Sequence, residues 1–145
     1  MIIFFLISFI TNIIGPLIPD IIQNFKLSLT AAGILPFSFF IAYGLFSVPS
    51  GYLIEFYGEK KIIIIGLLIS LMGSLFFSLN TNYFSGIVSF LLIGTGMAIL
   101  QVAINPLLRS TTNAENFAFF SIMGQFFFGL ASFFSPIFYV EILYC

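Results

Sequence analysis

The stretch IIIIGLLISLMGSLFF, residues 62–77, decides the fold class of this chain. Its residues are apolar or small, and they do not alternate between apolar and polar as the strands of a membrane barrel do. Inside lipid, such a segment satisfies its own backbone hydrogen bonds by forming an α-helix. The stretch therefore predicts a membrane-spanning helix.

The rest of the chain is equally apolar. Of its 145 residues, 61% are hydrophobic and 6% are charged, and the mean hydropathy is +1.22. A soluble domain has about 25% charged residues, so this chain cannot cover a soluble surface and we predict an integral membrane protein. Its four basic residues are too few for a nucleic-acid-binding protein.

Charged residues divide the chain into long uncharged segments, which are residues 1–19, 27–54, 62–108 and 116–140. A spanning helix needs about 20 apolar residues, and the segment 62–108 holds two such helices separated by the polar turn Asn80-Thr81-Asn82. We therefore predict an all-α polytopic membrane protein with a single transmembrane domain over residues 1–145. Its five transmembrane helices are expected near residues 2–24, 30–54, 61–79, 83–107 and 116–140.

Basic residues in short loops predict the orientation of the chain in the membrane. Lys60, Lys61 and Arg109 follow the second and fourth helices, whereas Lys26 alone follows the first. This excess places the N-terminus in the cytoplasm. The first helix lacks the basic segment and the cleavage site of a signal peptide, so we expect it to remain in the membrane.

Prolines and small residues predict how individual helices behave. Gly15-Pro16 and Pro19 are expected to bend or open the first helix, because proline donates no backbone hydrogen bond; a simple packing kink is the alternative. Small residues on the third and fourth helices predict close helix packing. These are Gly66, Ser70, Gly73, Gly94, Gly96 and Ala98.

The turn after the second helix reads GYLIEFYGEKK, residues 51–61. We expect Gly51 to allow the close approach of another helix, Glu55 to end the second helix, and Gly58 to permit the reversal of the chain. Arg109 ends the fourth helix on the same side of the membrane. An ion pair between Glu55 and Arg109, with Lys60 nearby, is therefore a candidate gate latch.

This turn resembles the G-x-L-x-D-R-x-G-R-K/R signature of the major facilitator superfamily. The resemblance runs through Gly51, Leu53, Glu55, Gly58 and Lys60, and the chain departs from the signature at Phe56 and Glu59. It implies a fold of twelve helices in two six-helix halves, with substrate held between the halves and reached alternately from each side. On that comparison the chain is expected to supply five helices of the N-terminal half, and the second half-bundle is absent.

The stretch LQVAINPLL, residues 100–108, is similar to the fourth helix of the fucose/galactose/glucose–proton symporter branch, which reads L-E-x-A-A-N-P. Gln101 stands at the acidic position, and Gly15 stands where the branch has a carboxylate in its first helix. The resemblance thus implies a sugar transporter that lacks both core carboxylates. We expect transport of a small neutral polar solute, a monosaccharide, without proton coupling through core carboxylates.

Asn and Gln amides both donate and accept hydrogen bonds without carrying charge, which suits a sugar-like substrate. The candidate substrate-binding residues are Asn12, Gln101, Asn105 and Gln125. An unpaired amide facing lipid costs several kcal/mol, so we expect these side chains to face the interior of the bundle. Hydrogen bonds between helices are the alternative role. Asp20 and Glu141 are interpreted as helix-end charges, with a displaced coupling acid as the alternative.

No cofactor, metal site or catalytic residue is expected, since the chain has no His and one Cys, Cys145. We therefore expect a transporter and not an enzyme. The expected partners are the lipid bilayer, a sugar-like small molecule, and the missing C-terminal half or another membrane chain. A bacterial inner membrane is the expected location. A truncated, non-transporting fragment or a small structural or accessory membrane subunit is the alternative.

Overall fold

The computed structural model describes residues 2–26, 28–80 and 82–144, and these residues form five α-helices. The helices are α1 (Ile2–Phe25), α2 (Leu29–Tyr57), α3 (Glu59–Leu79), α4 (Tyr83–Thr111) and α5 (Ala114–Tyr144). All five are long and apolar enough to cross a membrane, and at about 1.5 Å per residue each exceeds the roughly 30 Å hydrocarbon core. The predicted five-helix, all-α fold is confirmed, although Thr81 of the predicted polar turn and Cys145 lie outside the described residues.

The helix ends follow from local chemistry. The hydroxyl of Ser28 accepts a hydrogen bond from the backbone N–H of Ala31 at 3.3 Å and so caps the start of α2. Gly58 separates α2 from α3 with a φ of 80°, a left-handed conformation that glycine adopts without strain. The expectation that Glu55 ends the helix is wrong, because α2 continues to Tyr57.

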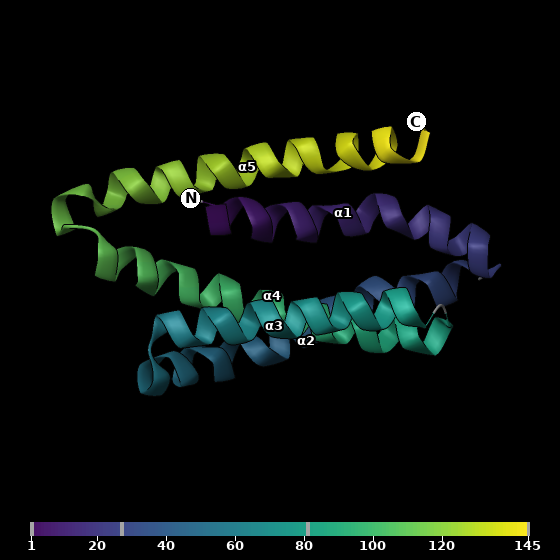
Figure 1. Cartoon of the computed structure of the whole chain (residues 1–145), viewed down its shortest axis with the longest axis horizontal. Coiled ribbons are helices and arrows are strands. Elements are labelled where there is room, and N and C mark those ends of the chain that lie inside the picture. The colour runs from purple at the N-terminus through teal and green to yellow at the C-terminus, as the bar shows by residue number, and fades with distance from the viewer. Residues whose placement is uncertain (1, 27, 81, 145) are drawn as a thin grey trace.

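The helices form two packing units, which lie side by side along the length of the molecule in Figure 1. The three-helix unit consists of α2, α3 and α4, with α4 in extensive contact with both α2 and α3. The α1–α5 pair lies beside it, and fewer contacts join the pair to α4 and α2. The seam between the two units is therefore less densely packed than the contacts of α4 with α2 and α3 or of α1 with α5.

Backbone contact at glycines holds the three-helix unit together. Gly94 of α4 lies directly against the backbone of Phe39 in α2, so that a Cβ atom there would overlap the Phe39 carbonyl oxygen. Gly96 lies against the backbone of α3, where a Cβ atom would be 2.7 Å from the carbonyl oxygen of Gly66 and would overlap the Ser70 hydroxyl. The predicted role of small residues in close packing is confirmed here.

Gly51 does not share this role. A Cβ atom at Gly51 would meet nothing within 4 Å, so the expectation that it allows close helix approach is wrong. Gly51 lies inside α2, which packs against α4 through Phe39 and Gly94, on a different part of the helix. Glycine at position 51 is thus not explained by helix packing within the part of the chain that the structure describes.

Side-chain hydrogen bonds hold the α1–α5 pair together. The Ser8 hydroxyl donates to the carbonyl oxygen of Phe128 at 2.6 Å, and the Ser135 hydroxyl donates to the carbonyl oxygen of Phe9 at 2.9 Å. Both bonds link residues early in α1 to residues in α5 in the same order, so the two helices run parallel. One close contact adds to them, since a Cβ atom on Gly124 of α5 would lie 2.9 Å from the ring of Phe4.

Helix α1 keeps its helical conformation through Pro16 and Pro19, so the predicted opening of the helix is wrong. Figure 1 shows that α1 changes direction toward its C-terminal end, which agrees with the predicted bend. Because neither proline has an N–H group, the carbonyl groups of Asn12 and Gly15 lack their usual partners four residues later. The bend therefore leaves polar backbone atoms in the middle of α1.

Candidate functional site

Helix α4 carries the amides Gln101 and Asn105, one turn apart on one face of the helix. Gln101 is half-buried and Asn105 is exposed, whereas Ala103 and Ile104 between them are buried against the bundle. The sequence folds this way because the apolar face of α4 packs inward and leaves the amide face at the surface of the five-helix unit. The structure records no side-chain hydrogen bond for either amide among the described residues.

Pro106 follows directly, and the last turns of α4 leave α3 and extend toward the start of α5 (Figure 1). Leu108, three residues after Asn105, lies on a neighbouring face of the helix. It lines a cavity that residues of α1 also line. The amide face of α4 is therefore next to the seam between the three-helix unit and the α1–α5 pair.

On α1, Asn12 is half-buried and oriented by its own helix. Its side-chain nitrogen donates to the carbonyl oxygen of Ser8 at 2.8 Å and lies 3.2 Å from the Ser8 hydroxyl oxygen. That hydroxyl in turn binds Phe128 of α5. This arrangement uses the donor side of the Asn12 amide, and no donor to its side-chain oxygen is recorded in the described part of the chain.

Gln125 lies on α5 and is exposed. Gly129, one turn later, is also exposed, and a Cβ atom there would meet nothing within 4 Å. The expectation that all four amides face the interior is thus wrong for Asn105 and Gln125. Among the described residues, the interior is filled by apolar side chains, glycines and small serine hydroxyls, and the larger amides are half-buried or exposed.

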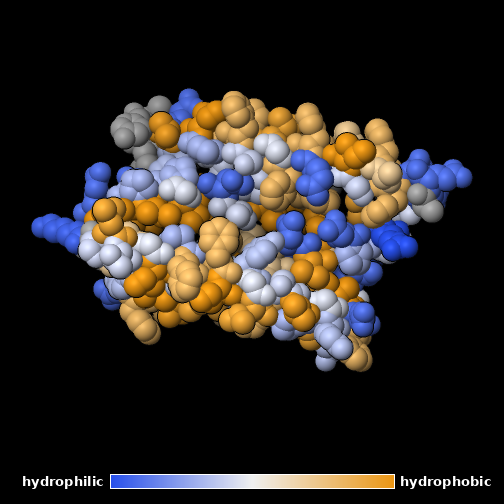
Figure 2. All heavy atoms as spheres, turned by 180° about the vertical axis from the view of Figure 1, so that it is seen from behind, coloured by the Kyte–Doolittle hydropathy of each residue, from blue (hydrophilic) through white to orange (hydrophobic). Residues whose placement is uncertain are grey.

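Hydrophilic side chains gather in the middle of one face, along the seam between the α1–α5 pair and the three-helix unit, with apolar side chains on either side (Figure 2). The α4 side of the seam carries no Asp, Glu, Lys or Arg over residues 83–108, whereas α1 carries the half-buried Asp20. Within the described ranges, no three His, Cys, Asp or Glu residues come together as metal ligands. The candidate amides themselves offer neutral hydrogen bonding.

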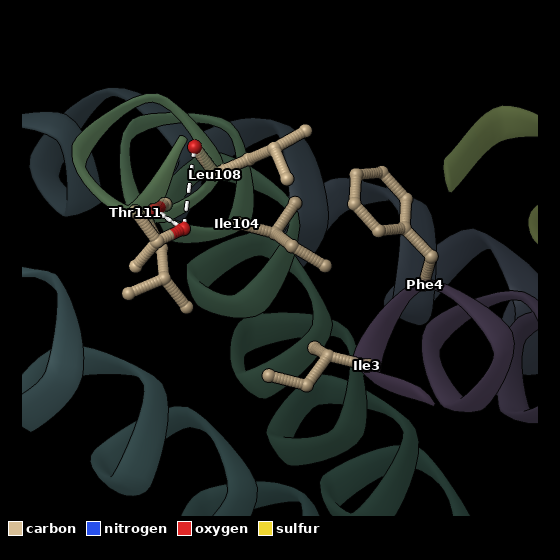
Figure 3. A pocket seen from close by; sticks show the side chains of 6 residues that line it. Ile3, Phe4, Ile104, Leu108 and Thr111 are labelled. Carbon is tan, nitrogen blue, oxygen red and sulfur yellow. Dashed lines mark hydrogen bonds between the residues drawn. The ribbon is translucent and has the colours of Figure 1, made fainter. Parts of the chain in front are cut away.

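A separate cavity of about 120 Å³ lies between the start of α1 and the end of α4. Figure 3 shows its lining, which consists of Ile3, Phe4, Ile104, Leu107, Leu108 and Thr111. The Thr111 hydroxyl donates within its own helix, to the carbonyl oxygens of Leu107 at 2.7 Å and Leu108 at 3.2 Å. The cavity thus offers apolar surface and lacks the hydrogen-bonding groups that a sugar requires.

The candidate gate residues lie at one end of the bundle. Glu55, Lys60 and Arg109 are exposed, and the structure records no ion pair between Glu55 and Arg109 among the residues it describes. An exposed pair of this kind would contribute only about 0–1 kcal/mol even when formed. In this conformation the predicted latch is not made.

Sequence reasoning missed three hydroxyl groups between α1 and α5, one of which, that of Ser8, contacts the candidate amide Asn12. Ser8, Ser135 and Tyr139 each bind across the α1–α5 interface. One signal was available, since Ser8 lies four residues before Asn12 and therefore on the same face of α1. The identity of the partner helix was not available, because it is more than a hundred residues away in the chain.

Comparison with known proteins gives a family match and similar transporters. The sequence profile of the Major Facilitator Superfamily matches residues 1–142. A glucose/galactose transporter of Brucella abortus is 31% identical over 140 residues, which cover 93% of this chain and 34% of that protein. The L-fucose-proton symporter of Escherichia coli is 30% identical over 106 residues, or 71% of this chain and 24% of that protein. The chain spans about a third of the length of the relatives it matches.

Proposed function

The chain belongs to the major facilitator superfamily, and from this premise we propose that it forms part of a secondary transporter for a monosaccharide or a similar neutral polar solute. The family match and the names of two relatives support sugar transport. The observation that carries the proposal is the pair of neutral amides Gln101 and Asn105, one turn apart on α4 in a stretch, residues 83–108, without a charged residue. Transport is proposed for the protein assembled with a second set of helices, on the same polypeptide or on another membrane chain.

In this proposal Asn12, Gln101, Asn105 and Gln125 bind the substrate hydroxyl groups. Each amide both donates and accepts, so it matches a hydroxyl without regard to protonation. Exposure of Asn105 and Gln125 supports this role, since a site between two half-bundles lies on the surface of each half. Alternating access then moves the second half relative to this surface, with the N-terminus of α1 on the cytoplasmic side of a bacterial inner membrane.

The same absence of charge bears on the coupling mechanism. Proton coupling requires a group that titrates, and an acid within the membrane is the usual candidate. Gly15 and Gln101 occupy the positions at which the resembling branch has carboxylates, and neither titrates. We therefore expect substrate movement that does not depend on a proton gradient.

The test is uptake of a panel of labelled hexoses by cells that carry the full-length gene, with and without a proton gradient. Gln101→Ala and Asn105→Ala should each raise the KM about tenfold, the effect of losing one hydrogen bond of about 1.4 kcal/mol. Gln23→Ala is the matched control, because Gln23 is an exposed amide near the end of α1 and is not one of the four candidate amides. Its KM should equal that of the unchanged protein.

Three results would each contradict a different part of the proposal. Equal effects of Gln23→Ala and Gln101→Ala on the KM would mean that the candidate amides do not bind the substrate. Uptake that stops when the proton gradient is dissipated would overturn the coupling mechanism. No uptake of any hexose by protein that is present in the membrane would favour the alternative, a non-transporting or accessory membrane protein.

A further inference from the structure

Near the C-terminal end of α1, Asp20 forms a hydrogen bond that differs from the others between α1 and α5. The Tyr139 hydroxyl of α5 donates to a carboxylate oxygen of Asp20. Both side chains are half-buried, and both residues lie in membrane-spanning helices about 7 Å, or five residues, from the helix ends. A hydrogen bond to an ionised acceptor is roughly twice as strong as one between neutral groups.

The surroundings of Asp20 contain no compensating cation. Helix α5 contributes Tyr139 and the exposed Glu141, whereas α2 and α4 carry no charged residue over residues 29–54 and 83–108. Lys26 follows α1 and is exposed, and within residues 2–26, 28–80 and 82–144 the structure records no ion pair with Asp20. Among the described residues, the side-chain partner that the structure records for Asp20 is therefore the neutral Tyr139 hydroxyl group.

We propose that Asp20 and Tyr139 form a proton-sensitive clamp that holds the C-terminal ends of α1 and α5 together. Ionised Asp20 accepts the Tyr139 hydrogen bond, and protonation converts the carboxylate into a weaker, neutral acceptor. The clamp is closed when Asp20 is ionised and loosens as the pH falls.

The bend in α1 allows this end to move on its own. Pro16 and Pro19 remove two backbone hydrogen bonds just before Asp20, so the last turns of α1 are less firmly joined to the rest of the helix. The hydroxyl–carbonyl bonds of Ser8 and Ser135 lie before this point in α1 and contain no group that titrates in this pH range. They remain closed when the clamp opens. The proposal does not depend on the identity of the transported solute.

The experiment measures the separation of the two helix ends in full-length protein reconstituted in liposomes. Spin labels on Asn24→Cys of α1 and Val140→Cys of α5 use two exposed positions, in a background with Cys145→Ser. Lowering the pH from about 8 to about 2 spans the ordinary range of carboxylic acids in proteins. We expect the ratio of wide to narrow separations to rise roughly five- to tenfold.

Three variants test the assignment. Asp20→Asn keeps the shape of the side chain but cannot titrate, so the label separation should not depend on pH. Tyr139→Phe removes the donor and should also abolish the pH dependence. Tyr83→Phe is the matched control, because the Tyr83 hydroxyl donates to the Ala31 carbonyl oxygen at 2.8 Å, a bond between α4 and α2 without a titratable acceptor. It should leave the pH dependence of the α1–α5 labels unchanged.

Glu141→Gln separates the contributions of the two acids near this end and should likewise preserve the pH dependence. A separation that is constant with pH in the unchanged sequence would overturn the clamp. A pH dependence that persists in Asp20→Asn or in Tyr139→Phe would overturn it as well. None of these readouts requires sugar uptake, so failure of the clamp and failure of the proposed transport are distinguishable.

Discussion

The three-helix unit and the α1–α5 pair use the same kinds of helix contact in different proportion. A hydroxyl bond from Tyr83 to Ala31 also joins α4 to α2, and a contact of Gly124 with Phe4 also joins α5 to α1. In the three-helix unit, glycines bring backbones into direct contact, as Gly94 does with Phe39. In the α1–α5 pair, hydroxyl groups bridge the helices, as Ser8 does with Phe128. Backbone contact tolerates no displacement, whereas a hydroxyl bond can break and form again. The comparison indicates a rigid scaffold beside a more adjustable pair, with the candidate site along the seam between them.

The largest expected effect is on the scaffold. Gly94→Ala places a methyl group onto the Phe39 carbonyl, which is backbone and cannot move aside, so we expect a loss of about 3 kcal/mol in the free energy of unfolding. Gly44→Ala on α2 is the control, since a Cβ atom there meets nothing within 4 Å. It should be neutral or slightly stabilising, because alanine favours helix formation. Unfolding by denaturing detergent, followed by circular dichroism, measures both; equal losses would refute the packing argument.

A somewhat smaller effect is expected at the α3–α4 contact. Gly96→Ala should cost about 2 kcal/mol, because the new methyl group meets both the Ser70 hydroxyl and the Gly66 carbonyl. Ser70→Ala removes one of these obstacles. In a double-mutant cycle, the Gly96→Ala and Ser70→Ala pair should recover about 1 kcal/mol. Strictly additive losses would show that the Ser70 hydroxyl does not restrict this contact.

The α1–α5 pair should respond less to the loss of one contact. Ser135→Ala removes the hydroxyl that binds the Phe9 carbonyl, and hydrogen bonds between membrane helices average about 0.6 kcal/mol. Ser74→Ala is the control, since Ser74 is exposed and bonds within its own helix, to the Ser70 carbonyl oxygen at 3.0 Å. The same unfolding assay should show no loss for it. A Ser135→Ala loss as large as that of Gly94→Ala would remove the distinction between the two units.

The smallest effect is expected at the end of α2. Glu55 is exposed, and no ion pair with Arg109 is recorded among the described residues. Glu55→Gln should therefore change the free energy of unfolding by less than about 0.5 kcal/mol, as surface substitutions generally do. Arg109→Gln should give the same result. A loss above about 1 kcal/mol for both variants, without additivity in the double variant, would mean that the latch forms after all.

Much of the fold could be predicted because the physics is local. Uncharged apolar segments set the five helices, and small residues such as Gly66 and Gly96 indicated where two helices touch. The pairing of α1 with α5 was not predictable, because nothing in the pattern around Ser8 specifies a partner at Phe128. The orientation of Asn105 and Gln125 was predicted wrongly. That prediction took the interior of five helices as the place sheltered from lipid, but that interior is filled by apolar groups.

The separation of α1 from its partner also has a consequence for synthesis. Ser8 and the Phe128 carbonyl to which it donates are 120 residues apart. At roughly 5 to 20 residues per second on the ribosome, about 6 to 24 seconds pass between their emergence. During that interval α1 has entered the bilayer with Ser8 and Asn12 not yet covered by α5, while α2, α3 and α4 can already associate. Of the five helices described, α1 is thus among the last to be locked in place, although it is made before the other four.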